Sequence, residues 1–156
     1  SGFVPRNHWL HDLSKGGGRL IGEACHFVDL TRDLIGFPIE RISLNKSKSD
    51  YLFDTFTLNI NFQDGSIASI HYFSNGNKSF PKETLQVFVD SNIFELSNFR
   101  NIKIWEKNRK DHIRRLNVDK GQKECINTFM NAIERKNPEP IKFEEIYEVH
   151  SLLLKL

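Results

Sequence analysis

A single histidine, His26, is flanked by two carboxylates at helical spacing. Glu23 comes three residues before it and Asp29 three residues after it, so an α-helix would place the three side chains along one edge. Imidazole gives and takes a proton near neutral pH, and a neighbouring carboxylate fixes its tautomer and raises its basicity. The spacing therefore fits a general acid/base, and it also fits the commoner case of a half-buried histidine bonded to a carboxylate.

Three glycines, Gly16 to Gly18, stand just before this segment. A helix that starts there would offer free N–H groups and a partial positive charge to an anion. However, the glycines lack the GxGxxG spacing of a dinucleotide site and the Lys-Ser/Thr of a phosphate loop. We therefore expect them to serve as a hinge and a point of close packing.

Other chemistries have less support. His8, His11, Cys25 and His26 are of metal-ligating types, but no CxxC or HExxH spacing occurs, so we expect no metal site. No serine or cysteine is marked as a nucleophile, because Cys25 points about 100° around the helix from His26. The cation-rich segment from Arg100 to Arg115 is expected to be a solvated sheet face. A nucleic-acid groove would need aromatic side chains along it, so we expect no nucleic-acid partner.

Hydrophobic periodicity predicts one helix, then six or seven strands, then two helices. The first helix, Gly17–Ile35, is stopped by Gly36 and Pro38. The predicted strands are 39–44, 56–62, 67–73, 83–89, 93–96, 101–106 and 112–116, and the predicted later helices are 121–136 and 143–156. This order indicates an α+β fold, namely an open, largely antiparallel sheet of six or more strands with helices packed on one face. The uncovered face would meet solvent or a partner, and we expect a homo-oligomer through it.

The length of 156 residues suits one domain over 1–156. A net charge of +2 with 38% hydrophobic residues is ordinary for a globular protein. No apolar run approaches the roughly 18 residues of a membrane span and no leader is evident, so we expect a cytoplasmic protein with no membrane partner. Cys25 and Cys125 are expected to be buried free thiols. The chain begins at Ser1 without a methionine, which suggests a fragment whose missing part lies N-terminal.

The run GGGRLIGEACHFVDL, Gly16–Leu30, resembles the GGG…CH…DL helix of the Gfo/Idh/MocA oxidoreductases, the family of glucose–fructose oxidoreductase and inositol dehydrogenase. Further similarity, in the same order, is found at Phe3–Trp9, Asp64–Ile67, Asn75–Glu83, Val87–Phe88 and Pro140–Ile146. The resemblance covers nearly the whole chain but only the family's second domain, whose fold is of the dihydrodipicolinate-reductase-like type. The form RLIGEACH, Arg19–His26, is most similar to a subgroup of the family in which this module is fused to an alcohol-dehydrogenase-like region.

This resemblance implies a division of labour between two domains. An N-terminal Rossmann domain, absent from this chain, would bind NAD or NADP and supply a lysine, so no cofactor is expected on this chain itself. The second domain would close the substrate pocket and supply a histidine, which maps to His26. The family's aspartate, four residues earlier, maps to Gly22, so that carboxylate is missing. Glu23 could substitute for it only from the other side of the ring.

The sequence therefore predicts the C-terminal substrate-binding and dimerisation domain of an NAD(P)-dependent oxidoreductase that acts on a sugar, sugar nucleotide or polyol. His26 would accept a proton from a substrate hydroxyl while hydride leaves its carbon, and Glu23 would orient or tune His26. Arg19 would contact an anionic group at the start of the helix. The residues expected to line the sugar site are Asn7, His8 and Trp9. The alternative is a non-catalytic scaffold that kept the fold and lost the acid/base site, and Gly22 is its main support.

Overall fold

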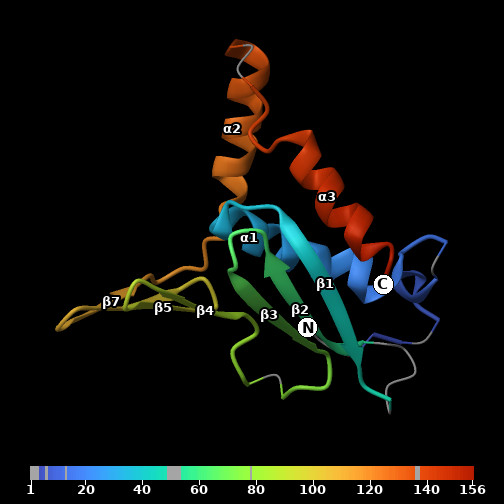
Figure 1. Cartoon of the computed structure of the whole chain (residues 1–156), viewed down its shortest axis with the longest axis horizontal. Helices are drawn as coiled ribbons and strands as arrows, with labels where there is room; N and C mark the ends of the chain where they lie inside the picture. Colours follow the sequence, from blue (N-terminus) through green and yellow to red (C-terminus); the bar gives the residue numbers. More distant parts are fainter. Residues whose placement is uncertain (1–3, 6, 13, 49–53, 78, 136–137) are drawn as a thin grey trace. The chain divides into compact units, whose positions relative to one another are not determined.

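The computed structural model describes residues 4–5, 7–12, 14–48, 54–77, 79–135 and 138–156 (Figure 1). The chain forms two compact units, Ser1–Gly76 with Ile141–Leu156, and Asn77–Pro140. Each unit contains its own antiparallel sheet. The single domain expected over residues 1–156 stays a prediction.

The first unit combines a three-stranded sheet with two α-helices and two short helices of other types. Its elements are the 3-10 helix η1 (Trp9–His11), the π-helix η2 (Leu20–Ala24), α1 (Cys25–Ile35), β1 (Ile39–Lys46), β2 (Thr55–Phe62), β3 (Ile67–Phe73) and α3 (Phe143–Leu153). The strands pair in the order β1-β2-β3, and Leu58 of β2 lies opposite Leu44 and Ile70. The alternate apolar residues of β2, from Phe56 to Phe62, are at most 2% exposed. They share a core with α1 and α3, so apolar residues at every second position turn one sheet face to the helices.

The turns of this unit use the residues that the sequence places there. Gly36 ends α1 in the left-handed conformation, with φ of 78°, and donates its N–H to Arg32 O at 2.9 Å. Gly65 has φ of 88° in the turn between β2 and β3. Asp64 accepts hydrogen bonds from Ser66 Oγ at 2.7 Å and Ser66 N at 3.0 Å, and these bonds lower the pKa of the Asp64 carboxyl. The Asp64–Gly65 hairpin predicted from the sequence is therefore confirmed.

The second unit is a four-stranded meander followed by one helix. Its elements are β4 (Thr84–Val89), β5 (Asn92–Ser97), β6 (Asn101–Glu106), β7 (Arg109–Arg114) and α2 (Gln122–Arg135). None of its described residues is buried. The apolar stripe of α2, which consists of Ile126, Phe129, Met130 and Ile133, is 46–63% exposed. This stripe therefore does not enter a core in the structure.

The α+β class and the antiparallel pairing predicted from the sequence are confirmed. The seven strands are, however, divided between sheets of three and four strands instead of forming one sheet. Residues 74–83 connect β3 to β4, and this connection is too long to fix their pairing as a tight hairpin would. Strand alternation indicates which face is buried, but it does not specify which strands pair.

The two cysteines have different environments. Cys25 is buried at the start of α1, whereas Cys125 is exposed on α2. Burial raises the pKa of the Cys25 thiol. The expectation that both thiols are buried is therefore correct only for Cys25.

The glycine run before α1 was expected to be a hinge and a point of close packing, and the structure shows the close packing. A Cβ at Gly16 would lie 2.6 Å from Leu10 Cα and 2.7 Å from the carbonyl oxygens of Leu10 and Trp9. Gly17 and Gly18 have φ of 65° and 70°, in the left-handed region that glycine adopts most readily. The glycines thus let the backbone of η1 contact the start of the helix.

One ion pair links both α-helices to the first strand. Arg32 Nε of α1 donates to Glu148 Oε2 of α3 at 3.0 Å. The other oxygen of Glu148 accepts a hydrogen bond from Ile39 N of β1. The Arg32 side chain is only 9% exposed, and Glu148 compensates its charge together with the more distant Glu145, whose Oε1 lies 3.8 Å from Arg32 Nη2.

We expect Arg32→Ala to lower the free energy of unfolding by about 3–5 kcal/mol, because it leaves a largely buried carboxylate without its cation. Urea denaturation followed by circular dichroism measures this change. The matched control is Arg41→Ala, an exposed arginine on β1 for which the described residues provide no ion pair. It should change the free energy by no more than about 0.5 kcal/mol. Equal effects of the two substitutions would contradict the role of the ion pair.

We expect Gly16→Ala to destabilise the protein by about 1–3 kcal/mol, because the new methyl group would overlap the backbone of η1. Thermal denaturation measures the change. Gly76→Ala is the control, since a Cβ at Gly76 meets nothing within 4 Å. A melting temperature for Gly16→Ala that matches the control would show that the close approach is not needed.

Candidate functional site

His26 lies in the first turn of α1 and is exposed to solvent. Within the part of the chain that the structure describes, its ring forms no hydrogen bond or ion pair. The neighbouring residues Ala24, Cys25 and Val28 are buried in the core. The helix is therefore anchored through one side and presents the imidazole on the other.

The π-helix η2 changes the relation between Glu23 and His26. Its i→i+5 hydrogen bonds widen the turn, so residues on its two sides do not keep the angular spacing of an α-helix. Glu23 pairs with Arg19, four residues earlier. Among the described residues, no hydrogen bond joins Glu23 to His26. The geometry thus differs from the expected arrangement in which Glu23 orients His26.

Glu23 is held by donors from two elements. Arg19 Nη1 donates to Glu23 Oε1 at 2.8 Å, and the Tyr72 hydroxyl of β3 donates to Glu23 Oε2. Arg19 Nη1 also donates to the Tyr72 oxygen at 3.0 Å. On its other side, Arg19 Nε lies 3.5 Å from Asp54 Oδ2, just before β2. We refer to Arg19, Glu23, Asp54 and Tyr72 as the arginine cluster.

Arg19 is the buried centre of the arginine cluster. Its side chain is 2% exposed and that of Asp54 is 7% exposed. Burial lowers the pKa of Arg19, but Tyr72, Glu23 and Asp54 together outweigh burial and leave the pKa raised. The guanidinium is therefore charged and surrounded by protein partners. In this structure Arg19 thus interacts with groups of the protein, and its contact with an anionic group of a substrate stays a prediction.

A second histidine, His11, adjoins the arginine cluster. Its side chain is 8% exposed, and Nδ1 lies 3.8 Å from Asp54 Oδ1. His11 Nε2 has no hydrogen-bond partner among the described residues. The distance to Asp54 is too long for a hydrogen bond, so His11 adjoins the cluster without bonding to it.

The aromatic segment before the glycines lies where the sequence suggested, at the start of the helix. The carbonyl of Trp9 contacts the position of Gly16, and the Trp9 side chain is 60% exposed. His8 Nδ1 accepts a hydrogen bond from Leu10 N at 3.2 Å and thereby caps η1. Asn7 is exposed. Contacts of these residues with a sugar stay a prediction.

Two members of the arginine cluster, Asp54 and Tyr72, were not predicted from the sequence. The alternation of inward and outward positions along a strand could have identified both residues. Asp54 is two residues before the buried Phe56 and four before the buried Leu58, which predicts the same inward face. Tyr72 lies opposite Phe56 in the sheet register. The rings of Phe56 and Tyr72 stack with centroids 5.1 Å apart. A polar residue at an inward position of a strand requires an internal partner.

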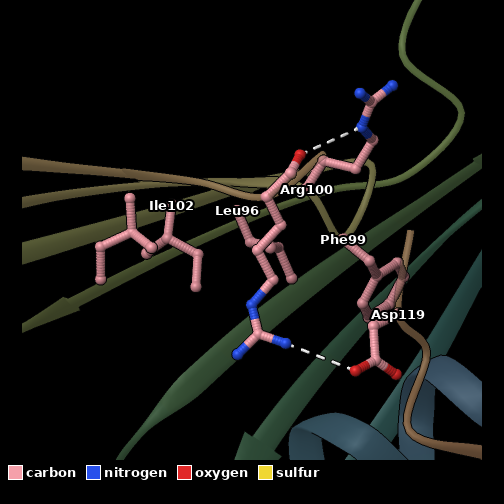
Figure 2. Close-up of a pocket in the computed structure, with 7 residues that line it drawn as sticks. Leu96, Phe99, Arg100, Ile102 and Asp119 are labelled. Atoms are coloured by element: carbon pink, nitrogen blue, oxygen red, sulfur yellow. Dashed lines mark hydrogen bonds and ion pairs between the residues drawn. The ribbon is translucent and has the colours of Figure 1, made fainter. Parts of the chain in front are cut away.

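Two pockets lie elsewhere on the surface, and His26 lines neither of them. One is on the second unit, where Leu96, Phe99 and Ile102 lie beside Arg100 and Asp119 (Figure 2). Cations of the Arg100–Arg115 segment bind neighbouring groups within that unit. Examples are Lys103 with Glu95 at 2.6 Å, Arg115 with Asp119 at 3.3 Å and Arg100 Nη2 with Leu116 O at 2.7 Å.

Neither a metal centre nor a membrane span is found in the described residues. No three His, Cys, Asp or Glu side chains among them are grouped so as to hold a metal ion. None of the helices in the same residues has the length and apolar character that crossing a membrane requires. We take the arginine cluster and the exposed ring of His26 as the candidate site because of their own geometry.

Comparison with known proteins gives matches among solved structures. No family model and no curated protein matches the sequence. UDP-N-acetylglucosamine 3-dehydrogenase GnnA from Acidithiobacillus ferrooxidans is 16% identical with a TM-score of 0.77, and the match covers 100% of this chain and 50% of that protein. Levoglucosan dehydrogenase in complex with NADH and levoglucosan is 17% identical with a TM-score of 0.75, over 98% and 50% of the two chains. Dehydrogenase MviM from Clostridium difficile is 19% identical with a TM-score of 0.71, over 88% and 46%.

At these identities the likeness concerns the fold. This chain spans about half the length of the dehydrogenases that it matches. The α+β fold that the Gfo/Idh/MocA resemblance implied is thereby confirmed, and the chain has the fold of one half of these dehydrogenases.

Proposed function

We propose that this chain is the substrate-binding part of an NAD(P)-dependent oxidoreductase that acts on a sugar, a sugar nucleotide or a polyol. The observation that carries the proposal is the exposed imidazole of His26, which has no protein partner among the described residues. It lies on a helix whose start is fixed by close packing at Gly16. The fold supports the proposal, since it is shared with half of a levoglucosan dehydrogenase that was solved with NADH and levoglucosan.

In this proposal His26 is the general base. A ring nitrogen of neutral His26 accepts the proton of a substrate hydroxyl, and its exposure lets the hydroxyl reach it. When bound, the nicotinamide cofactor supplies the acceptor for the hydride that leaves the same carbon.

The glycine run of this chain does not suit the pyrophosphate of such a cofactor. Gly16–Gly18 follow the short helix η1 instead of a strand, and Gly16 is packed against Leu10. We therefore propose that a Rossmann domain of the same polypeptide holds NAD or NADP. The small-molecule substrate would then lie between that domain and the helix that carries His26.

The exposed aromatic segment would form one wall of the sugar site. The Trp9 indole is 60% exposed and offers an apolar face to the C–H groups of a sugar ring. His8 lies beside it, with ring centroids 5.4 Å apart. Asn7 is exposed and supplies a side-chain amide for hydroxyl groups.

The second candidate function is a scaffold domain without chemistry. It is favoured by Gly22, which stands where the resembling family has its aspartate. A Cβ at Gly22 would lie 3.1 Å from Gly16 O and 3.1 Å from Leu10 Cδ1, so a larger residue needs a shift of its neighbours. That carboxylate is thus absent at this position. A catalytic role therefore has to rest on His26 without it.

We also propose that the protein self-associates through a sheet face. On the β4–β7 sheet, Leu85, Leu96, Ile102 and Ile113 lie opposite one another across the four strands. Ile113 is 49% exposed. A contiguous apolar face of this kind is typical of an interface, and a second copy of the chain would cover it.

The proposed chemistry predicts that His26→Ala lowers kcat/KM by about 10²–10⁴-fold, the usual contribution of a general base. The assay follows NADH or NADPH formation by the full-length protein with levoglucosan and other neutral sugars. The control is His112→Ala, an exposed histidine on β7, which should leave turnover unchanged. An unchanged rate for His26→Ala would remove His26 from the chemistry and favour the scaffold.

The proposed self-association predicts that Ile113→Asp shifts the full-length protein to a monomer, because it places a charge on the apolar face. Sedimentation velocity measures the mass. Arg114→Asp, at the neighbouring position on the opposite face of β7, is the control and should leave the mass unchanged. A wild-type protein that is monomeric at high concentration would contradict the proposal.

A further inference from the structure

We infer that Glu23 is the group that selects the substrate, by accepting hydrogen bonds from hydroxyls of a neutral polyol. This inference rests on the proposed function and assigns Glu23 a role separate from His26. The arrangement of donors around the carboxylate, its exposure and the charge of its surroundings carry the argument.

The carboxylate of Glu23 is fixed in direction before any substrate arrives. Arg19 holds Oε1 at 2.8 Å, and the Tyr72 hydroxyl holds Oε2. Tyr72 is itself stacked on Phe56 at 5.1 Å with an interplanar angle of 11°. Arg19 is fixed from its other side by Asp54 at 3.5 Å. Both oxygens are thus oriented by residues of the helix and the sheet, which is the pre-organisation that a binding group needs.

Glu23 is the member of the arginine cluster that reaches solvent. Its side chain is 36% exposed, whereas those of Arg19 and Asp54 are 2% and 7% exposed, and Tyr72 is 6% exposed. Each carboxylate oxygen accepts more than one hydrogen bond. Both oxygens therefore keep acceptor capacity on a side chain that is partly exposed to solvent.

The charge of the cluster determines which ligand fits. Glu23 is the charged group of the cluster that reaches solvent, since the side chains of Arg19 and Asp54 are buried. An exposed carboxylate favours hydroxyl donors and repels carboxylates and phosphates. Adjacent hydroxyls of a sugar can donate to both oxygens of one carboxylate. The class of ligand at this position is therefore a neutral polyol and not a sugar acid.

This assignment makes Arg19 and Tyr72 positioning residues for Glu23. They do not reach the substrate, because their polar groups are turned to one another and to the carboxylate. Tyr72→Phe removes one donor while it keeps the ring that stacks on Phe56. It should therefore weaken the binding of polyols less than the loss of the Glu23 charge does.

Saturation-transfer difference NMR on the full-length protein tests the assignment, with levoglucosan and D-glucuronate as probes. We expect levoglucosan to bind and D-glucuronate to bind at least about tenfold more weakly. Glu23→Gln should weaken levoglucosan binding about tenfold or more, and Tyr72→Phe should weaken it by a smaller factor. Asp33→Asn, which changes an exposed carboxylate of α1, is the matched control and should leave binding unchanged. Melting temperatures near that of the wild type show that the variants are folded.

The outcomes separate this inference from the proposed chemistry. His26→Ala should keep levoglucosan binding even where it abolishes turnover, so loss of turnover alone supports the chemistry and not the role of Glu23. Unchanged binding in Glu23→Gln, absent binding of levoglucosan to the wild type, or tighter binding of D-glucuronate would each overturn the inference. An unchanged KM with an altered pH profile of kcat in Glu23→Gln would also overturn it, because Glu23 would then act through His26.

Discussion

The buried guanidinium of Arg19 is the interaction on which the candidate site depends. A cation that is 2% exposed is stable only when opposite charges and acceptors surround it. Glu23, Asp54 and Tyr72 supply these from the π-helix, the start of β2 and β3. The same contacts that stabilise the charge therefore fix how the helix lies on the sheet. They also fix the direction of the one carboxylate that reaches solvent.

Close packing next to Arg19 also involves the glycines of this segment. The backbone of η1 contacts Gly16, and Leu10 and the Gly16 carbonyl lie so close to Gly22 that a Cβ there would be only 3.1 Å away. A side chain at position 22 therefore requires its neighbours to shift slightly. The carboxylate of the next residue, Glu23, pairs with Arg19 at i,i+4 spacing. The carboxylate is thus one position along the chain from where the resembling family has it, and it has different partners.

Much of the local structure could be predicted from the sequence, because apolar spacing determines it directly. The alternation from Phe56 to Phe62 and the Asp64–Gly65 turn predicted β2 and its hairpin. The pairing of Glu23 with Arg19 has the i,i+4 spacing that helical geometry allows, but spacing alone does not decide between Arg19 and His26 as the partner of Glu23. Nothing in strand alternation indicated two sheets. β3 and β4 belong to separate sheets, and periodicity does not specify which strands pair.

The separation of Glu23 from His26 has a consequence for how such a site can work. A histidine paired with a carboxylate has its tautomer fixed by the protein. His26 has no such partner among the described residues, so a substrate hydroxyl that is correctly placed must itself complete its hydrogen bonding. The position of the substrate then depends on a group that is held in place before binding. The carboxylate of Glu23, which Arg19 and Tyr72 hold, is such a group. Because the two side chains share no contact, their contributions to binding and to proton transfer should be nearly independent.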